Sequence, residues 1–352
     1  MKPILQGLAA TCIAAVAATG ALAQANLTAE TSSPGNSPHV SILHLAEIAS
    51  ANGIANLQVQ EGQTLTNSLV NVAEGKTDIT AMPLILPFLL NAGRGPFSSI
   101  GEERGAELAS NVRALYPYNA GAFGLIALES EGIDSWEDLE GKNVWNGPPR
   151  GAALVNARQA IAGVTGFADG EDYTGHQSNW AQLATLLVDG SMDAFVVPLT
   201  FPSSRVTTMQ AAGDVVIVST PKDVFEGDAY QRLFNAPGNV PIVVAWEDMG
   251  YSDGVRLISE DATFRGLGTA FADLVHKDMP FDRAKALTTA YIESMEELKS
   301  KTPYAGNIGV GVLDPKLSGF CGVNPLKYHA GAVAAWEEAG YDVPDCAKPE
   351  AS

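Results

Sequence analysis

The stretch EGKTDITAMPLILP at residues 74–87 returns as DGSMDAFVVPLTFP at residues 189–202, so every matched position is offset by 115. In both copies a Gly follows an acidic residue, an Asp opens a short and mainly apolar run, and Pro-Leu-x-x-Pro closes it. Gly ends helices because it tolerates positive φ, and Pro cannot continue a central strand, so the matched residues have specific backbone roles. The repeat predicts two lobes of similar construction, with corresponding strands at residues 78–82 and 193–197.

Short strands alternate with helices around this repeat. Strands are predicted at residues 27–30, 56–60, 112–116 and 123–128, and helices at 40–50 and 65–74. Beyond residue 218 the pattern predicts a strand at 240–245 and long helices at 262–276 and 283–300. Such alternation is typical of mostly parallel sheets covered by helices on both faces, so the predicted fold class is α/β.

The two predicted lobes are discontinuous in sequence. We expect lobe I to comprise residues 24–117 and 220–352 and lobe II residues 118–219, with hinges near residues 116–118 and 219–221. In parallel sheets ligands bind beyond the carboxyl ends of the strands. Two such lobes facing each other therefore predict one ligand cleft between them.

The first 23 residues combine a basic start at Lys2, an apolar run and small residues before Gln24, which predicts a cleaved secretory signal peptide. No later stretch offers the roughly 20 uninterrupted apolar residues that a membrane helix needs. The chain carries 40 Asp and Glu against 21 Lys and Arg. An acidic surface is repelled by phosphate backbones, so nucleic acid is excluded as a partner.

Two cysteines, Cys321 and Cys346, remain once the signal peptide with Cys12 is removed. In an exported protein such a pair predicts a disulfide, which would close a loop of about 25 residues and contribute about 3 kcal/mol to stability. The alternative is two unrelated free thiols.

The segment VWNGPPRGAA at residues 144–153 predicts a rigid turn from a strand into a helix. The first N–H groups of a helix are unpaired and attract a carboxylate or phosphate, and Arg150 adds a bidentate charged donor. The segment therefore predicts an anion site. The alternative is an ordinary turn whose Arg150 points into solvent.

The loops at the expected cleft are rich in hydroxyl, amide and glycine residues, with aromatic side chains as apolar walls. We expect the ligand to be a small organic anion of one or two carboxylates with a modest apolar body. The predicted ligand-binding residues are Ser33, Asn36, Gln63, Thr64, Asn67, Tyr118, Trp145, Gly147, Arg150, Gly151, Ala152, Thr200 and Phe201.

Sequence motifs of catalysis are absent. There is no Gly-x-Ser-x-Gly elbow, no Walker loop and no dinucleotide fingerprint. The five histidines show no metal spacing. We therefore expect neither an enzyme nor a cofactor or metal.

Several segments in order resemble the TAXI family of solute-binding subunits of tripartite ATP-independent periplasmic (TRAP) transporters. They are EGQTLTN at residues 61–67, VAEGKTDI at 72–79, IDSWEDLEGK at 133–142, NGPP at 146–149, DGSMDAF at 189–195, and HAGA with EAG at 329–332 and 338–340. The resemblance covers nearly all of the mature chain.

The resemblance implies a type II periplasmic-binding-protein fold. It also implies a periplasmic receptor whose lobes close on a carboxylate or amino acid and deliver it to a TRAP membrane permease. An alternative role is a periplasmic sensor that binds a similar ligand and docks on a signalling receptor. The chain departs from its relatives after the two prolines, where Arg150-Gly151-Ala152-Ala153 replaces the usual Gly-Ser-Gly-Thr.

Overall fold

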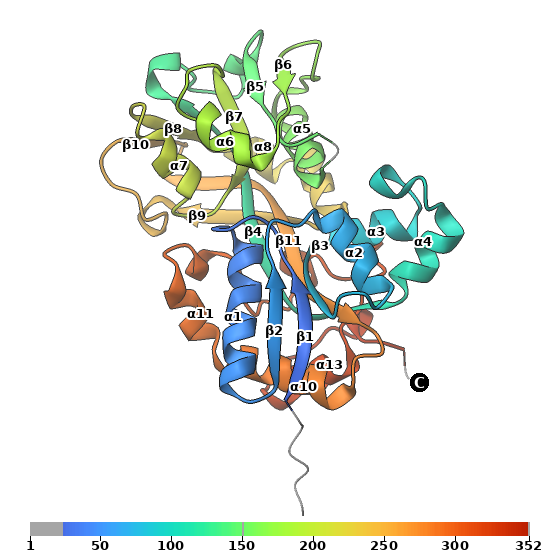
Figure 1. Cartoon of the computed structure of the whole chain (residues 1–352). Coiled ribbons are helices and arrows are strands. Elements are labelled where there is room, and N and C mark those ends of the chain that lie inside the picture. The colour runs from blue at the N-terminus through green and yellow to red at the C-terminus, as the bar shows by residue number, and fades with distance from the viewer. Residues whose placement is uncertain (1–23, 150, 351–352) are drawn as a thin grey trace, which may run out of the picture.

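The computed structural model describes residues 24–149 and 151–350. Within these ranges eleven strands form one sheet, and Figure 1 shows two lobes joined by the long strands β4 and β11. The strands are β1 (Ala25–Glu30), β2 (Ala55–Gln60), β3 (Ile79–Pro83), β4 (Val112–Leu128), β5 (Asn143–Trp145), β6 (Thr174–His176), β7 (Ala194–Leu199), β8 (Val215–Val218), β9 (Asn239–Ala245), β10 (Val255–Ile258) and β11 (Thr263–His276). The helices are α1 (Ser37–Ala51), α2 (Leu65–Ala73), α3 (Ile85–Asn91), α4 (Glu102–Ala109), α5 (Ala152–Thr165), α6 (Trp180–Leu186), α7 (Ser204–Met209), α8 (Lys222–Glu226), α9 (Asp228–Gln231), α10 (Phe281–Glu293), α11 (Met295–Lys301), α12 (Pro315–Ser318) and α13 (Ala330–Glu338).

The outer strands of the sheet form two sets with the same order. β1 lies between β2 and β3, and β5 lies between β6 and β7, and all four pairings are parallel. We name β2, β1 and β3 the first sheet half, and β6, β5 and β7 the second sheet half. β3 begins at Ile79 and β7 at Ala194, so the two copies of the sequence repeat hold equivalent positions. The predicted α/β class with two similarly built parts is confirmed.

The two long strands cross between the sheet halves and pair antiparallel with their neighbours. Two sequence predictions are wrong here. Residues 112–128 form one strand rather than two, and residues 263–276 form β11 rather than a helix. Twelve of the fourteen residues of β11 are buried, because the strand has neighbours on both edges and cover on both faces. A strand buried in this way lacks the alternation that distinguishes it from a helix.

Large aromatic side chains fill the interior of both lobes. Trp336 and Tyr291 belong to the main buried cluster, and Trp136 and Tyr230 to a second cluster. The predicted Cys321–Cys346 disulfide is present, with the two Cα atoms 5.5 Å apart. Across residues 24–149 and 151–350, no helix is long and apolar enough to cross a membrane.

Candidate ligand-binding site

The parallel strands of both sheet halves end on loops that lead into helices. In the first sheet half, β1 runs into α1 and β2 into α2; in the second, β5 runs into α5 and β7 into α7. The side chain of Asn307 connects the two parts, because its Nδ2 donates to the Phe201 carbonyl at 3.0 Å. Tyr304, three residues earlier, lies 3.5 Å from the Gly35 carbonyl in the loop before α1. The carboxyl edges of the two sheet halves thus approach the same segment.

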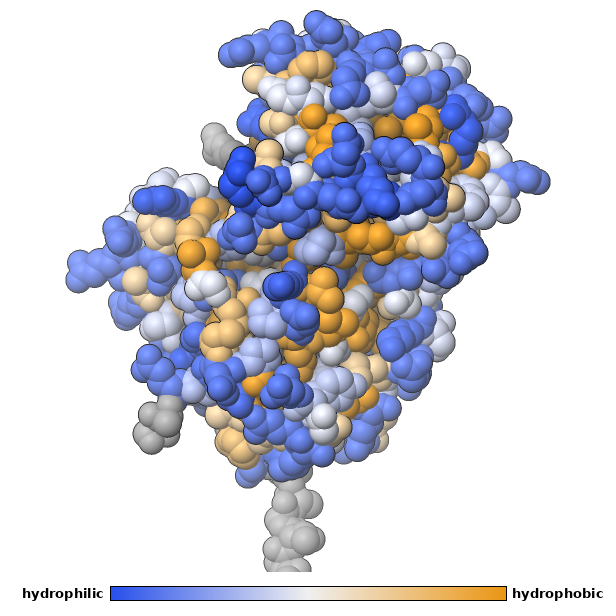
Figure 2. Space-filling view, turned by 180° about the vertical axis from the view of Figure 1, so that it is seen from behind, coloured by the Kyte–Doolittle hydropathy of each residue, from blue (hydrophilic) through white to orange (hydrophobic). Residues whose placement is uncertain are grey.

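The surface agrees with this arrangement. Seen from behind, the outline of the molecule is indented between the two lobes, and apolar residues gather where the lobes meet (Figure 2). Two further concavities lie elsewhere. One of about 350 Å³ is lined by Asn52 and by α10, and one of about 260 Å³ by Trp136 and Pro221. Neither involves the carboxyl edges, so we place the candidate site between the lobes.

The predicted residues of the first sheet half lie at the starts of α1 and α2. Asn36 caps α1: its Oδ1 accepts from the His39 N–H and from Ser32 Oγ, so this oxygen already serves the fold. Ser33 is half-buried in the same loop. Gln63, Thr64 and Asn67 are exposed around the first turn of α2.

The side chains at the start of α2 are polar. Thr64 occupies the N-cap position without a side-chain hydrogen bond to the helix, and the Gln63 Nε2 donates to the Glu61 carbonyl. The exposed Thr64 hydroxyl therefore remains available, whereas the Gln63 amide already has one backbone partner.

In the second sheet half the turn after β5 is fixed by its own contacts. Asn146 donates from Nδ2 to Asp169 and accepts from Gln177 through Oδ1. Gly147 has φ +122°, and a Cβ at this position would lie 3.0 Å from the Leu154 nitrogen, so only Gly fits. The turn is a rigid entry into α5.

The start of α5 has no side-chain cap. Gly151, which has no side chain, holds the N-cap position, and Ala152 is the first helical residue. Arg150 lies outside the described residues, as does the predicted signal peptide at residues 1–23. The anion site at this helix start stays a prediction.

The predicted aromatic walls are more deeply placed than expected. Trp145 is fully buried and donates from Nε1 to Ser178 Oγ at 2.9 Å. The ring of Phe201 packs on Phe264, with the ring centres 4.7 Å apart, while its carbonyl faces Asn307. Thr200 is half-buried beside them, and its hydroxyl lies 3.3 Å from the Pro202 carbonyl.

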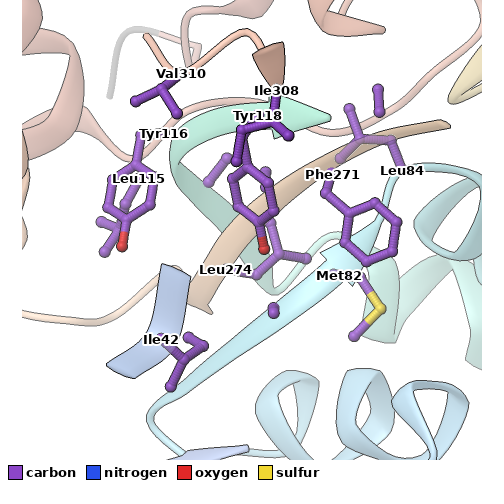
Figure 3. Close-up of a cluster of buried hydrophobic side chains, with 14 of the residues drawn as sticks. Ile42, Met82, Leu84, Leu115, Tyr116, Tyr118, Phe271, Leu274, Ile308 and Val310 are labelled. Atoms are coloured by element: carbon purple, nitrogen blue, oxygen red, sulfur yellow. The ribbon is translucent and has the colours of Figure 1, made fainter. Parts of the chain in front are cut away.

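Tyr118 lies in the buried core rather than on a wall of the expected cleft. Figure 3 shows the Tyr116 and Tyr118 rings pointing the same way from β4 among buried side chains. Their hydroxyls donate to Asp273 of β11 at 2.8 and 2.9 Å, and Ser41 of α1 donates to it at 2.8 Å. Burial raises the pKa of Asp273 to about 6, although the three donors favour its charged form. This carboxylate is enclosed by protein, and its three hydroxyl donors already satisfy it.

Sequence reasoning missed three hydroxyls at the edge of the first sheet half. Thr31 follows β1, Ser37 begins α1 and Ser68 lies near the start of α2. All three are buried, and none of the three hydroxyl oxygens has a hydrogen-bond partner among the described residues. Leaving a buried hydroxyl unpaired costs about 1 to 3 kcal/mol. A polar residue between a strand and a helix, or in the first turn of that helix, was the signal that could have found them.

A cation of the second sheet half was also missed. Arg205 lies in α7, directly after β7, and its Nη1 donates to the Pro198 carbonyl at 2.6 Å. Within the described ranges no group of three or more His, Cys, Asp and Glu is placed to hold a metal ion. The edges thus offer hydroxyls on one side and a guanidinium on the other.

A family model described as the NMT1-like family matches residues 39–340, which is most of the chain. The chain belongs to the NMT1-like family. No curated protein gives a significant match.

Solved structures similar to this NMT1-like protein include solute receptors of bacteria. DctP7 of Bordetella pertussis, an extracytoplasmic solute receptor binding pyroglutamic acid, is 11% identical over 80% of this chain and 83% of that chain, with a TM-score of 0.44. A TRAP periplasmic solute-binding protein of Desulfovibrio salexigens with bound orotic acid is 13% identical over 80% of each chain, with a TM-score of 0.44. The periplasmic ectoine-binding protein of the TeaABC TRAP transporter of Halomonas elongata is 12% identical over 89% of this chain and 90% of that chain, with a TM-score of 0.43.

Solute-binding proteins of TRAP transporters are thus among the structures that resemble this NMT1-like chain. The finer TAXI assignment stays a prediction.

Proposed function

We propose that this NMT1-like protein is a periplasmic receptor of the TAXI type, which captures a small organic anion between its lobes and delivers it to a TRAP membrane permease. The observation that supports this most is the pair of sheet halves with one strand order, whose carboxyl edges approach a common segment. Ligands of open α/β sheets bind at such edges.

The groups at the edges fit capture better than catalysis. Thr31, Ser37 and Ser68 are buried donors without partners in the described chain, and a ligand with several acceptors would satisfy them. At the first edge His39 Nε2 lies 3.1 Å from Glu61 Oε1, and the second edge carries the Arg205 guanidinium. We propose that these polar groups serve binding.

Thermal melting of the mature chain, residues 24–352, tests the proposal. A ligand that binds only the folded state at a concentration 100 times its Kd stabilises it by about 2.7 kcal/mol, and the melting midpoint rises by several degrees. We expect this rise with at least one acid among pyroglutamate, orotate, benzoate, meta-hydroxyphenylacetate and common amino acids. A panel without any shift would contradict the proposed ligand class.

The transporter role has a separate test. The gene is expected to lie beside a gene for a large fused TRAP permease, and a neighbouring signalling receptor gene instead would favour the sensor role. The proposal of ligand binding and the proposal of delivery to a permease are therefore tested separately.

A further inference from the structure

Arg205 is partly exposed, and its charge has no acid partner in the part of the chain that the structure describes. Its Nη1 donates to the Pro198 carbonyl, and its guanidinium carbon lies 4.9 Å from the centre of the Trp180 ring. Its remaining donors, Nε and Nη2, have no hydrogen-bond partner in the described part of the chain and are not among the buried unpaired atoms. These donors are open on the in-plane edge of the guanidinium.

Among the described residues, no carboxylate lies within ion-pair distance of Arg205, although acids outnumber basic residues in this chain. Arg158 and Arg256, by contrast, each bind a carboxylate, Asp169 and Glu129 respectively. Burial lowers the pKa of Arg205 to about 10, and no neighbouring acid opposes this shift. A charge taken from water without a partner is unfavourable, so its presence requires a compensating role.

The surroundings of Arg205 belong to the carboxyl edge of the second sheet half. Trp180 packs on Trp145, with the ring centres 5.3 Å apart, and Trp145 is the last residue of β5. β5 and β7 are adjacent and parallel, so the segments that follow them lie at one edge. Arg205 follows β7 there, four residues beyond Phe201, whose carbonyl contacts Asn307.

The geometry points to Arg205 as the carboxylate anchor of the ligand site, with Trp180 beside it as the apolar wall. The ligand class is a small organic carboxylate whose acid group accepts from Nε and Nη2 together. Trp180 covers one face of the guanidinium and Pro198 occupies Nη1, so the free edge presents the fork that matches two carboxylate oxygens. This inference rests on the proposed function and places the charge on the β7 side of the edge, independently of Arg150.

Calorimetric titration with paired probes tests the anchor. The probes are benzoate, meta-hydroxyphenylacetate and pyroglutamate, each with its neutral primary amide. For the wild type we expect at least one acid to bind, and to bind about 10- to 100-fold more tightly than its amide, the range for a charge-assisted hydrogen bond. Arg205→Gln should remove that preference by weakening the acid alone, and Arg205→Lys should restore part of it.

Arg256→Gln is the matched control, because Arg256 already pairs with Glu129 and should leave both affinities unchanged. Circular dichroism tests whether each variant is folded. If Arg205→Gln is not folded, the affinities of Arg205→Lys decide the question. Equal acid affinity in wild type and in the Arg205 variants would contradict the role of Arg205 as the carboxylate anchor. It would not contradict the proposed receptor function. Binding of neither acids nor amides would overturn the proposed ligand class together with the anchor.

Discussion

The two sheet halves share one strand order and differ in the chemistry that follows their strands. The edge of the first sheet half presents buried hydroxyls, from Thr31, Ser37 and Ser68. The edge of the second presents a guanidinium that has no acid partner among the described residues and lies beside two tryptophans. The same backbone arrangement therefore serves two kinds of contact, neutral donors from one side and a charge with an apolar wall from the other.

Two charged side chains show the same contrast. Asp273 below the first sheet half has three hydroxyl donors and no exposed surface. Arg205 of the second sheet half has one carbonyl partner and keeps its other donors open. A sealed and fully bonded charge specifies the core, whereas a partly bonded one is available to a ligand.

The largest expected effect concerns the disulfide, which ties only the lobe of the first sheet half. Replacing Cys321 and Cys346 by Ser together should lower the free energy of unfolding by about 3 kcal/mol, because the crosslink restricts the unfolded chain. Urea denaturation at neutral pH measures this. An unchanged midpoint would mean that the bond contributes nothing to the stability of this lobe.

A second prediction separates two titrating groups in the core below the first sheet half. Burial, with Lys301 nearby, lowers the pKa of His44 to about 4, so the unfolded chain takes up the proton more readily and stability is lost as the pH falls from about 6.5 to 4. The pKa of Asp273 is raised to about 6, so the folded chain takes up the proton more readily and stability is lost as the pH rises from about 4 to 6. The two contributions have opposite signs and nearly cancel.

Single variants should reveal each contribution. Relative to wild type, His44→Gln should lose about 2 kcal/mol of unfolding free energy between pH 4.5 and 7, because only the Asp273 contribution remains. Asp273→Asn should gain about 2 kcal/mol over the same interval. Urea denaturation at both pH values measures the two slopes, and parallel slopes in all three proteins would contradict this account.

The smallest expected effect tests the hydroxyls. Thr31→Val removes a buried hydroxyl without a partner in the described chain, so the ligand-free protein should be unchanged or more stable by up to about 1 kcal/mol. Thr80→Val is the control, since the Thr80 hydroxyl is equally buried but donates to the Glu30 carbonyl at 3.1 Å, and its loss should destabilise by about 1 kcal/mol. Equal destabilisation by both variants would show that Thr31 serves the fold alone.

Sequence predicted those parts of the fold whose residues have backbone roles. Gly75 and Gly190 end the segments before β3 and β7, both at positive φ, and the repeat containing them located both strands. β11 was mistaken for a helix because burial on both faces removed its alternation. No single segment shows that two crossing strands join the halves, since that depends on pairing across distant parts of the chain.

The candidate site was only partly predictable for a related reason. Thr64 and Gly151 were found because helix starts have a local signature. Tyr118 was expected on the wall of the ligand cleft, but it shares a strand face with Tyr116 and both reach Asp273 on the neighbouring strand. Arg205 was missed because α7 has only six residues, and the lack of an acid partner appears only in three dimensions.

Small-angle X-ray scattering tests most directly whether the two edges close on a ligand. Residues 24–352 should be measured alone and with a saturating amount of the acid that binds best in calorimetry. The account predicts a smaller radius of gyration with the acid, since a ligand bridging the hydroxyl edge and Arg205 favours the closed arrangement. The neutral amide of the same acid at equal concentration should leave the profile unchanged. Identical profiles with and without the acid, at proven saturation, would contradict closure of the two lobes on their ligand.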